Sequence, residues 1–374
     1  MKNVLLLGAT GSIGKSVLSV ISQNKESLNL IGISFNKNVS RYQEILEKHS
    51  PDYVYIEDHD SFKSLCRNKE RYLNGDEELE RLINRDDVDI IVCATSGFAG
   101  LKTAYIASKT GKKILLANKE SIVAGGDLIL PLAKENNTKI IPIDSEHNAI
   151  FQCLSGEKGT EDVKSITITA SGGPFINAPI QDLQHVTVED ALKHPNWKMG
   201  SKVTIDSATL VNKCLELIEA RYLFDLDEKY FDLVIHPQSI IHSIVTYIDG
   251  SSLCQMSAPD MRVPVAHALS EENRIPIDFK DIDFSNLNLS FQEFPSDRSK
   301  IQDIAREVCN KGGFLGTVFN AANEIAVESF LDKKIKFNEI YEVIYRTFDI
   351  NIVSNEVTIE SINEVDAQTR IHAQ

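Results

Sequence analysis

The glycine-rich run Gly8-Ala-Thr-Gly-Ser-Ile-Gly14 is the feature that most constrains the fold of this chain. It follows a short apolar run, Val4–Gly8, and precedes a segment of helical periodicity, Ile13–Gln23. Glycines between a buried strand and a helix allow a tight turn and let the backbone approach a pyrophosphate held at the helix start. We therefore expect a nucleotide-binding strand–turn–helix unit at the beginning of the chain.

Strands and helices alternate through the first 144 residues. We predict a helix over Leu101–Ser108 and strands over Leu28–Ser34, Val88–Ala94, Lys113–Ala117 and Lys139–Asp144. Short β-rich runs between helices indicate βαβ units and a parallel, doubly wound sheet. The predicted fold class is α/β, with a Rossmann-like domain at residues 1–146.

The pattern changes after Val163. Predicted strands over Ser165–Thr169, Leu233–Ile235 and Ile240–Tyr247 indicate a central α+β domain at residues 147–274. Residues 275–297 are rich in Asp, Asn, Ser and Pro, and we interpret them as a linker. Helical spacing over Ile301–Asn310, Gly316–Leu331 and Phe337–Phe348 predicts a helical domain at residues 298–374.

Composition excludes several classes of protein. The 374 residues carry a formal charge of −15, which argues against a nucleic-acid surface. Apolar runs are too short for a membrane span, and the apolar start of the chain is too short for a signal peptide. The six cysteines form no C-x-x-C pair, so a reducing, cytoplasmic compartment is expected.

The glycine run is compatible with two kinds of nucleotide. Ala9-Thr-Gly-Ser-Ile-Gly-Lys-Ser16 differs from a P-loop only by Ala in place of the first glycine. The residues after the second predicted strand, Phe35-Asn-Lys-Asn38, favour the dinucleotide interpretation. They lack the acid that holds the ribose hydroxyls of NAD, and their lysine suits a 2′-phosphate. NADPH is the expected cofactor.

A set of acids predicts a metal site. Asp144 and Glu146 lie two residues apart at the end of a predicted strand, so both side chains can point to one side. A third acid comes from the helix after Ala208, where Glu216 is favoured over Glu219 because Asn212 shares its face. Oxygen ligands select Mg²⁺ or Mn²⁺ rather than zinc.

Several residues have the chemistry to hold a phosphate. Ser171-Gly-Gly-Pro174 follows a predicted strand and offers a hydroxyl with flexible N–H groups. Ser207, Asn212 and Lys213 add a hydroxyl, an amide and an ammonium. Taken singly, the Ser171 segment could be a plain turn, Ser207 or Asp206 a helix cap, and Lys213 a surface charge.

The segment His194-Pro-Asn-Trp-Lys-Met-Gly200 has the composition of a mobile lid, with Pro and Gly near its ends and the single Trp of the chain within it. Trp197 could equally be a core anchor. His194 and His236 could be ligands, phosphate donors or structural residues; we take His242, His267 and His49 as structural.

These motifs together resemble the 1-deoxy-D-xylulose 5-phosphate reductoisomerase family. The similarity covers residues 1 to about 330, in the order of the family's motifs. The motifs that carry it are Gly8–Gly14, Leu116–Ser121, Asp144–Gln152, Ser171–Phe175, His194–Trp197, Asp206–Thr209, Val234–Ser239, Pro259–Arg262 and Asn320–Glu324.

The resemblance implies an NADPH-dependent oxidoreductase of the non-mevalonate (MEP) isoprenoid pathway that forms 2-C-methyl-D-erythritol 4-phosphate. It implies a V-shaped homodimer in which the central domain is catalytic and dimerising. The reaction would proceed by retro-aldol cleavage and aldol rejoining at a metal-bound substrate, followed by hydride transfer to the branched aldehyde. A non-catalytic NADPH-sensing module is the alternative from a different class, and a P-loop kinase is a weaker one.

The resemblance also assigns roles to residues. Lys119 and Glu146 would be catalytic, and Asp144, Glu146 and Glu216 would bind the metal. Those expected to contact the substrate are Lys119, Ser145, Glu146, Ser171, His194, Ser207, Asn212, Lys213 and Glu216. Those expected to line the cofactor are Thr10, Gly11, Ser12, Ile13, Asn36, Lys37, Asn38, Asn118, Glu120 and Gly200. The chain departs from the family pattern in having Ala9 for serine and Asn36 for glycine.

Overall fold

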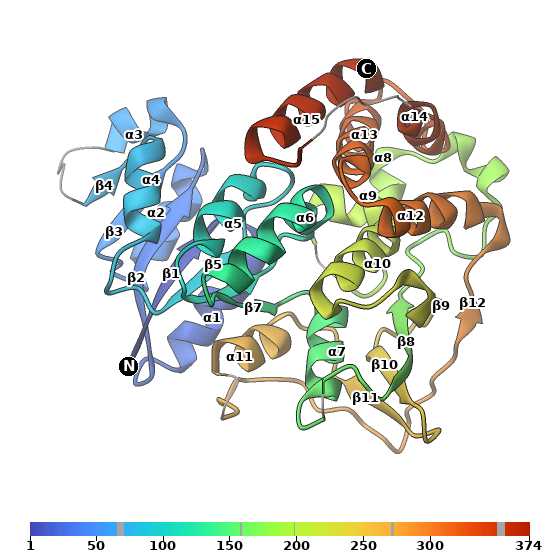
Figure 1. Cartoon of the computed structure of the whole chain (residues 1–374), viewed down its shortest axis with the longest axis horizontal. Coiled ribbons are helices and arrows are strands. Elements are labelled where there is room, and N and C mark those ends of the chain that lie inside the picture. Colours follow the sequence, from blue (N-terminus) through green and yellow to red (C-terminus); the bar gives the residue numbers. More distant parts are fainter. Residues whose placement is uncertain (66–70, 158, 198, 271–272, 350–355) are drawn as a thin grey trace. The chain divides into compact units, whose positions relative to one another are not determined.

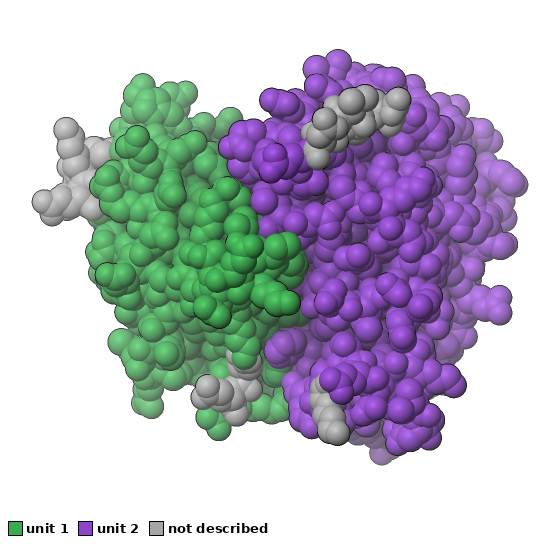
Figure 2. Space-filling model, viewed as in Figure 1, with its two compact units in different colours: residues 1–118, 129–144, 261–279 green, residues 119–128, 145–260, 280–374 purple. Residues whose placement is uncertain are grey.

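The structure is a computed structural model that describes residues 1–65, 71–157, 159–197, 199–270, 273–349 and 356–374 (Figure 1). The chain divides into two compact units (Figure 2). Unit 1 comprises Met1–Asn118, Ile129–Asp144 and Met261–Phe279, and unit 2 comprises Lys119–Leu128, Ser145–Asp260 and Lys280–Gln374. Among the described residues, no helix is both long and apolar enough to cross a membrane.

Unit 1 is built on a seven-stranded parallel sheet with strand order β4-β3-β2-β1-β5-β6-β7. Its strands are β1 (Lys2–Leu7), β2 (Leu28–Phe35), β3 (Tyr53–Ile56), β4 (Tyr72–Leu73), β5 (Ile90–Cys93), β6 (Lys113–Leu116) and β7 (Lys139–Pro142). Strand order reverses at β1, which pairs with β2 on one side and β5 on the other. In open α/β sheets ligands bind at such a switch point, beyond the carboxyl ends of the strands.

Helices connect the strands of unit 1. They are α1 (Ser12–Gln23), α2 (Val39–Leu46), α3 (His59–Leu65), α4 (Asp76–Ile83), α5 (Gly100–Ser108) and α11 (Arg262–Ser270), which packs against α1. Helix α4 shows how sequence sets such an element: three acids fill its first turn, and Leu79, Leu82 and Ile83 form its buried face. Helix α6 (Lys119–Glu135) begins in unit 2, is kinked at Gly125 and ends in unit 1.

Unit 2 contains a five-stranded mixed sheet with strand order β11-β10-β8-β9-β12. Its strands are β8 (Val163–Ala170), β9 (Phe231–Ile235), β10 (Ile241–Tyr247), β11 (Ser252–Met256) and β12 (Gln292–Glu293). Strands β8 and β9 are parallel and the other pairs are antiparallel. Helix α7 packs against β10 and β11, which places its side chains over one end of the sheet.

The helices of unit 2 carry most of the polar residues singled out in the sequence. They are α7 (Ser145–Leu154), α8 (Val188–Ala191), α9 (Ser201–Thr209), α10 (Val211–Phe224), α12 (Ser299–Lys311), α13 (Leu315–Leu331), α14 (Glu339–Phe348) and α15 (Ile359–Ala373). Short 3₁₀ turns lie at Ile180–His185, Glu228–Tyr230 and Ser296–Arg298. Most residues of helix α13 are buried, and α9, α14 and α15 all pack against it.

The predicted fold class is confirmed, with a parallel Rossmann-like sheet, a second mixed sheet and a helical C-terminal region. Two local predictions were wrong. Strand β7 ends at Pro142, so Glu146 lies in the first turn of α7 rather than on a strand. The helix expected after Ala208 begins only at Val211, as α10, because Leu210 in the left-handed conformation (φ 63°) separates it from α9.

This break also corrects the expectation of a helix cap. Asp206 and Ser207 lie inside the last turn of α9, and neither begins a helix. The predicted domain boundaries at residues 146/147, 274/275 and 297/298 remain a proposal. The structure divides into two units, fewer than the three domains and linker that were predicted.

Candidate active site

The glycine turn of unit 1 has the conformation that a nucleotide site needs. Gly8 has φ +92°, and a Cβ there would lie 2.5 Å from the Ala94 carbonyl oxygen. A Cβ on Gly14 would lie 2.4 Å from the carbonyl oxygen of Ala9. Both positions therefore exclude a side chain, because real Cβ atoms do not approach a backbone atom this closely. Gly11 precedes α1 in an extended conformation and has no side chain that could cap the first N–H groups of the helix.

A cavity of about 330 Å³ opens beside this turn. Three of the predicted cofactor residues, Thr10, Gly11 and Asn36, line it. Its other lining residues are Gly8, Ser34, Phe35, Tyr55, Glu57, Leu79, Ala94, Thr95, Ser96, Ala99, Lys102 and Thr103. Most of them lie at or just after the ends of β1, β2, β3 and β5, which is the edge where a dinucleotide binds in this kind of sheet, whereas Leu79 belongs to α4 and Lys102 and Thr103 belong to α5.

The other predicted cofactor residues have varied surroundings. Ser12 and Ile13 form the first turn of α1. The Nζ of Lys37 lies 3.8 Å from Asp58, and 76% of its side chain is exposed, so it remains accessible to a ligand. The side chain of Asn38 caps α2 by accepting from the Arg41 amide at 3.0 Å.

Asn118 is buried and donates to the carbonyl oxygens of Thr95 (2.7 Å) and Gly97 (2.9 Å). These bonds hold the loop that follows β5, part of which lines the cavity. Glu120 and Gly200 belong to unit 2, where Gly200 is the residue that precedes α9.

In unit 2 five predicted residues form one hydrogen-bonded group, which we call the carboxylate–lysine cluster: Lys119, Glu146, Asn212, Lys213 and Glu216. The Nζ of Lys213 lies 2.8 Å from Glu146 and 2.5 Å from Glu216. The Nζ of Lys119 lies 2.8 Å from Glu216 and 3.0 Å from the amide oxygen of Asn212. Three helices, α6, α7 and α10, thus bring their side chains together.

Charges in this cluster are largely removed from water. Lys119, Lys213 and Glu216 are 8%, 4% and 1% exposed. Burial alone would lower the pKa of Lys213, but the carboxylates of Glu146 and Glu216 outweigh it and raise that pKa above its usual value. Lys213 is therefore a fixed cation at neutral pH. Ser145 adds a hydroxyl that donates to Glu146 at 2.5 Å.

The predicted metal ligands fit a divalent cation. Carboxylate oxygens of Asp144, Glu146 and Glu216 all lie within 4.8 Å of one another. Asp144 is joined directly to Ser145, the first residue of α7. An all-oxygen donor set of three acids suits Mg²⁺ or Mn²⁺.

A second group, the hydroxyl–histidine cluster, consists of Ser171, His194 and Ser207. The Nε2 of His194 lies 3.0 Å from the Ser171 hydroxyl and 3.2 Å from that of Ser207, and the two hydroxyls are 3.4 Å apart. Its Nδ1 accepts from the amides of Asn196 (3.1 Å) and Trp197 (2.9 Å). Because Nδ1 accepts, the ring hydrogen lies on Nε2 and points at the two hydroxyls. Burial lowers the pKa of His194 to about 4, so the ring is neutral at pH 7.

The loop that carries Ser171 fits closely against α9. Gly172 and Gly173 have φ of +86° and +66°. A Cβ on Gly173 would lie 2.8 Å from the carbonyl oxygen of Ser207 and 2.9 Å from the Cα of Ala208. The absence of a side chain there lets the loop approach the end of α9, and this places Ser171 beside Ser207.

In the predicted lid segment, His194–Gly200, Lys198 is not among the residues that the structure describes. Trp197 is half-buried with its ring 6.0 Å from that of His242. Asn196 donates to the Pro237 carbonyl oxygen at 2.6 Å. His236 is structural: its Nδ1 meets the Ser290 carbonyl oxygen at 2.9 Å and its Nε2 meets the amides of Ile240 and Ile241 at 3.2 Å.

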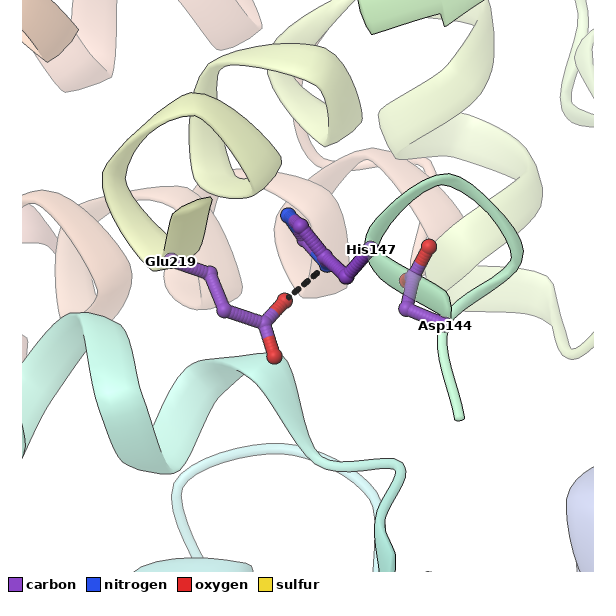
Figure 3. Close-up of side chains that lie close together, drawn as sticks. All are labelled: Asp144, His147 and Glu219. Carbon is purple, nitrogen blue, oxygen red and sulfur yellow. Dashed lines mark ion pairs between the residues drawn. The ribbon is translucent and has the colours of Figure 1, made fainter. Parts of the chain in front are cut away.

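Two groups of contacts were not predicted, although Glu120 is among the expected cofactor residues and Glu219 is the alternative to Glu216 as a metal ligand. Lys202 lies 2.9 Å from both Glu120 and Asp206, and Asn323 donates to Asp206 at 2.8 Å. The four-residue spacing of Lys202 and Asp206 was a usable signal for this pair. His147 and Glu219 form the other group, a fully buried pair 3.0 Å apart (Figure 3). No spacing in the sequence indicated it, since His147 and Glu219 come from separate helices.

Three family profiles match the chain. They are 1-deoxy-D-xylulose 5-phosphate reductoisomerase at residues 4–126, its C-terminal domain at residues 140–224, and the DXP reductoisomerase C-terminal domain at residues 256–372. A curated 1-deoxy-D-xylulose 5-phosphate reductoisomerase from Clostridium perfringens is 43% identical over 380 residues, which is 99% of this chain and 98% of that protein. The chain belongs to this family. A relative of the same name from Clostridium botulinum is 42% identical over 377 residues, again covering 99% and 98%.

Solved reductoisomerase structures have the same fold. The enzyme from Zymomonas mobilis in complex with NADPH matches with a TM-score of 0.91 at 38% identity, covering 100% of this chain and 98% of that one. A reductoisomerase in complex with NADPH, fosmidomycin and magnesium matches with a TM-score of 0.92 at 37% identity, covering 100% and 97%. These relatives give no support to the alternative of a non-catalytic NADPH sensor.

Proposed function

We propose that this chain is a 1-deoxy-D-xylulose 5-phosphate reductoisomerase that isomerises and reduces its substrate to 2-C-methyl-D-erythritol 4-phosphate, with NADPH and Mg²⁺ or Mn²⁺ as cofactors. The observation that carries the proposal is the meeting of Glu146 and Glu216 with Lys119 and Lys213 in one buried cluster. Buried acids and lysines of this kind are suited to a metal and a polar substrate. The product serves the non-mevalonate route to isoprenoids.

The metal would be held by Asp144, Glu146 and Glu216, whose oxygens are close enough together to share one ion. When bound, the metal supplies Lewis-acid polarisation of the substrate's carbonyl and hydroxyl oxygens, and NADPH supplies the hydride. In the structure Lys213 bridges Glu146 and Glu216. A bound cation would take oxygen ligands from these same two carboxylates.

The substrate backbone would contact Lys119 and Ser145, with Glu146 as the proton-handling group. Lys119 Nζ is oriented by Asn212 and Glu216, so its hydrogen-bond donors already point into the cluster. Glu146 lies beside the Ser145 hydroxyl, which holds its carboxylate in one orientation. One carbon–carbon bond breaks and a different one forms between the two fragments, which gives a branched aldehyde, and hydride transfer with uptake of a proton gives the alcohol.

The substrate phosphate would be held by Ser171, His194 and Ser207, together with Asn212 and Lys213. The two hydroxyls and the Nε2–H of His194 converge within 3.4 Å of one another, so they can all donate to one anion. Phosphate binding away from the reacting carbons orients the substrate. The segment His194–Gly200 would exclude water as a lid.

NADPH would bind at the glycine turn of unit 1. Thr10 to Ile13 would receive the pyrophosphate at the start of α1, and Lys37 with Asn36 and Asn38 would contact the adenosine 2′-phosphate. Asn118, Glu120 and Gly200 would complete the cofactor site. The cavity beside Gly8 and Asn36 supports this location.

The decisive experiment is NADPH oxidation, followed by absorbance, with 1-deoxy-D-xylulose 5-phosphate in the presence and absence of Mn²⁺ or Mg²⁺. We expect oxidation that requires both the sugar phosphate and the metal and that fails with NADH. Absence of oxidation by a protein that binds NADPH would contradict the proposed activity and favour a sensor.

We further propose that the chain acts as a homodimer in the cytoplasm, with the sheet of unit 2 at the interface. Strand β11 is an edge strand with Leu253 45% exposed, and the neighbouring Ile248 is 69% exposed. The described cysteines are unpaired thiols, which suits a reducing compartment. Light scattering coupled to size-exclusion chromatography would test the dimer, and a single-chain mass would contradict it.

A further inference from the structure

A buried histidine connects the two helices that carry the proposed metal ligands of unit 2. His147 follows Glu146 in α7 and is 0% exposed. Its Nε2 lies 2.9 Å from the backbone carbonyl oxygen of Glu216 in α10. Its Nδ1 lies 3.0 Å from the carboxylate of Glu219, which is 1% exposed (Figure 3). One ring therefore contacts α10 twice, one helical turn apart.

The polarity of these contacts fixes how the ring is held. A carbonyl oxygen only accepts hydrogen bonds, so Nε2 carries a hydrogen and donates to Glu216. Rotating the ring would take its hydrogen-bond donor away from the buried carbonyl oxygen of Glu216, which costs free energy as for any unsatisfied buried polar group, and would also break the 3.0 Å contact with the Glu219 carboxylate. The Glu219 contact therefore fixes the ring plane, and the Nε2–H bond fixes the backbone of Glu216 relative to α7.

The contacts of His147 bear on the distance between two proposed metal ligands, Glu146 and Glu216. Glu146 is adjacent to His147 in the chain, and Glu216 is the residue whose carbonyl oxygen the ring contacts. Any shift of α10 along α7 would break the ring's contacts and also change the separation of the two carboxylates. Outer groups that orient metal ligands typically contribute about 10- to 100-fold to metal affinity or activity.

We propose that His147 and Glu219 are positioning residues that hold Glu146 and Glu216 at the separation required for a divalent cation. The inference rests on the proposed metal site, and neither residue needs to touch the metal or the substrate. Asp144, His147 and Glu219 also have possible ligand atoms within 4.8 Å of one another, so direct ligation by the ring is the competing interpretation that the experiment must separate.

The experiment is a titration of the purified full chain with Mn²⁺ alone, with free Mn²⁺ measured by electron paramagnetic resonance. We expect His147→Leu and Glu219→Leu to raise the Mn²⁺ dissociation constant by about 10- to 100-fold. His147→Gln and Glu219→Gln keep a polar group in reach of the partner, and we expect them to restore a large part of the affinity. The NADPH dissociation constant, which reports on unit 1, should stay unchanged in all four variants.

A matched control is His236→Gln, since His236 is also a fully buried histidine of unit 2 that contacts a backbone carbonyl oxygen. It should lower the melting temperature without changing Mn²⁺ affinity. If the unsubstituted chain binds no Mn²⁺, the proposed metal site fails and this inference fails with it. If that chain binds Mn²⁺ and the folded Leu variants bind it equally well, only this inference fails. A nitrogen ligand detected by pulsed electron paramagnetic resonance in the Mn²⁺-loaded protein would also overturn this inference, because the His147 ring would then be a metal ligand itself.

Discussion

Lys213 and Glu216 lie one turn apart on α10, and the Nζ of the lysine is 2.5 Å from the carboxylate of the glutamate. The same ammonium group reaches Glu146 on α7 at 2.8 Å. A single buried cation thus contacts two proposed metal ligands from different helices. This arrangement limits repulsion between the acids and keeps their oxygens close together.

The first prediction concerns Glu216→Gln. The amide keeps the size of the side chain but removes the charge that both Lys213 and a metal require. Loss of one group that stabilises a transition state lowers turnover by on the order of 100- to 1000-fold. We expect at least that loss of NADPH oxidation, with NADPH affinity unchanged in a binding titration. Equal loss of turnover and of NADPH affinity would contradict a metal role and indicate a role in folding.

The second prediction concerns Gly173→Ala. Gly173 has φ +66°, and an added Cβ would press on the carbonyl oxygen of Ser207. A left-handed conformation costs a non-glycine residue roughly 1–2 kcal/mol, and displacement of the loop would move Ser171 away from Ser207. We expect the KM for the sugar phosphate to rise about tenfold, which corresponds to about 1.4 kcal/mol of binding energy.

Gly250→Ala is the matched control for this change. Gly250 lies in the same unit with φ +89°, but nothing lies within 4 Å of the position that a Cβ would take there. Both variants should lose stability through backbone strain, and only Gly173→Ala should change the KM. The role of the loop in placing Ser171 would be refuted by an unchanged KM in Gly173→Ala.

The third prediction concerns the pH dependence of stability. Burial lowers the pKa of His194 to about 4 in the folded chain, against about 6.5 when unfolded. The unfolded state therefore binds more protons between these values, and the stability that His194 contributes above pH 6.5 is lost as the pH falls toward 4. We expect His194→Gln to lose less unfolding free energy than the unsubstituted chain between pH 7 and pH 5. Urea unfolding followed by circular dichroism would measure this difference, and an identical pH dependence in both proteins would contradict a ring that burial keeps neutral.

Much of the fold could be predicted because its signals are local. Gly8 and Gly14 are required because a Cβ at either position would lie 2.5 Å or less from a backbone oxygen. Buried strands such as Ile90–Cys93 are uninterrupted apolar runs in the sequence. The two-residue strand β4 and the strand β12 give no such pattern, since neither is long enough for a period to appear.

The site was predictable in its residue types but not in its contacts. The break between α9 and α10 occurs at Leu210, and a leucine in the left-handed region has no signature in the sequence because tertiary packing imposes it. His147 was missed for a related reason. Its partners in α10 lie about 70 residues away along the chain, and only the packing of α7 against α10 brings them together.

The fourth prediction concerns the polar group Glu120, Lys202, Asp206 and Asn323, which connects α6, α9 and α13. Burial raises the pKa of Asp206, opposed by Lys202 and Asn323, whereas Lys202 overcomes the effect of burial on Glu120 and lowers the pKa of that residue. The lysine is thus shared by two acids, at 2.9 Å from each. Removing one partner of a buried ion pair costs about 3–5 kcal/mol. Because Lys202 would keep Glu120, we expect Asp206→Ala to lower the free energy of unfolding by roughly 3 kcal/mol, near the lower end of that range.

Urea unfolding followed by the fluorescence of Trp197, the single Trp of the chain, would measure this loss in unit 2. The control is Glu307→Gln, which breaks an exposed pair with Lys311 whose side chains are 42% and 66% exposed. Exposed pairs contribute about 1 kcal/mol or less, so this variant should unfold almost as the unsubstituted chain does. A loss in Asp206→Ala no larger than in the control would show that Lys202 and Asp206 interact no more strongly than charges at the surface.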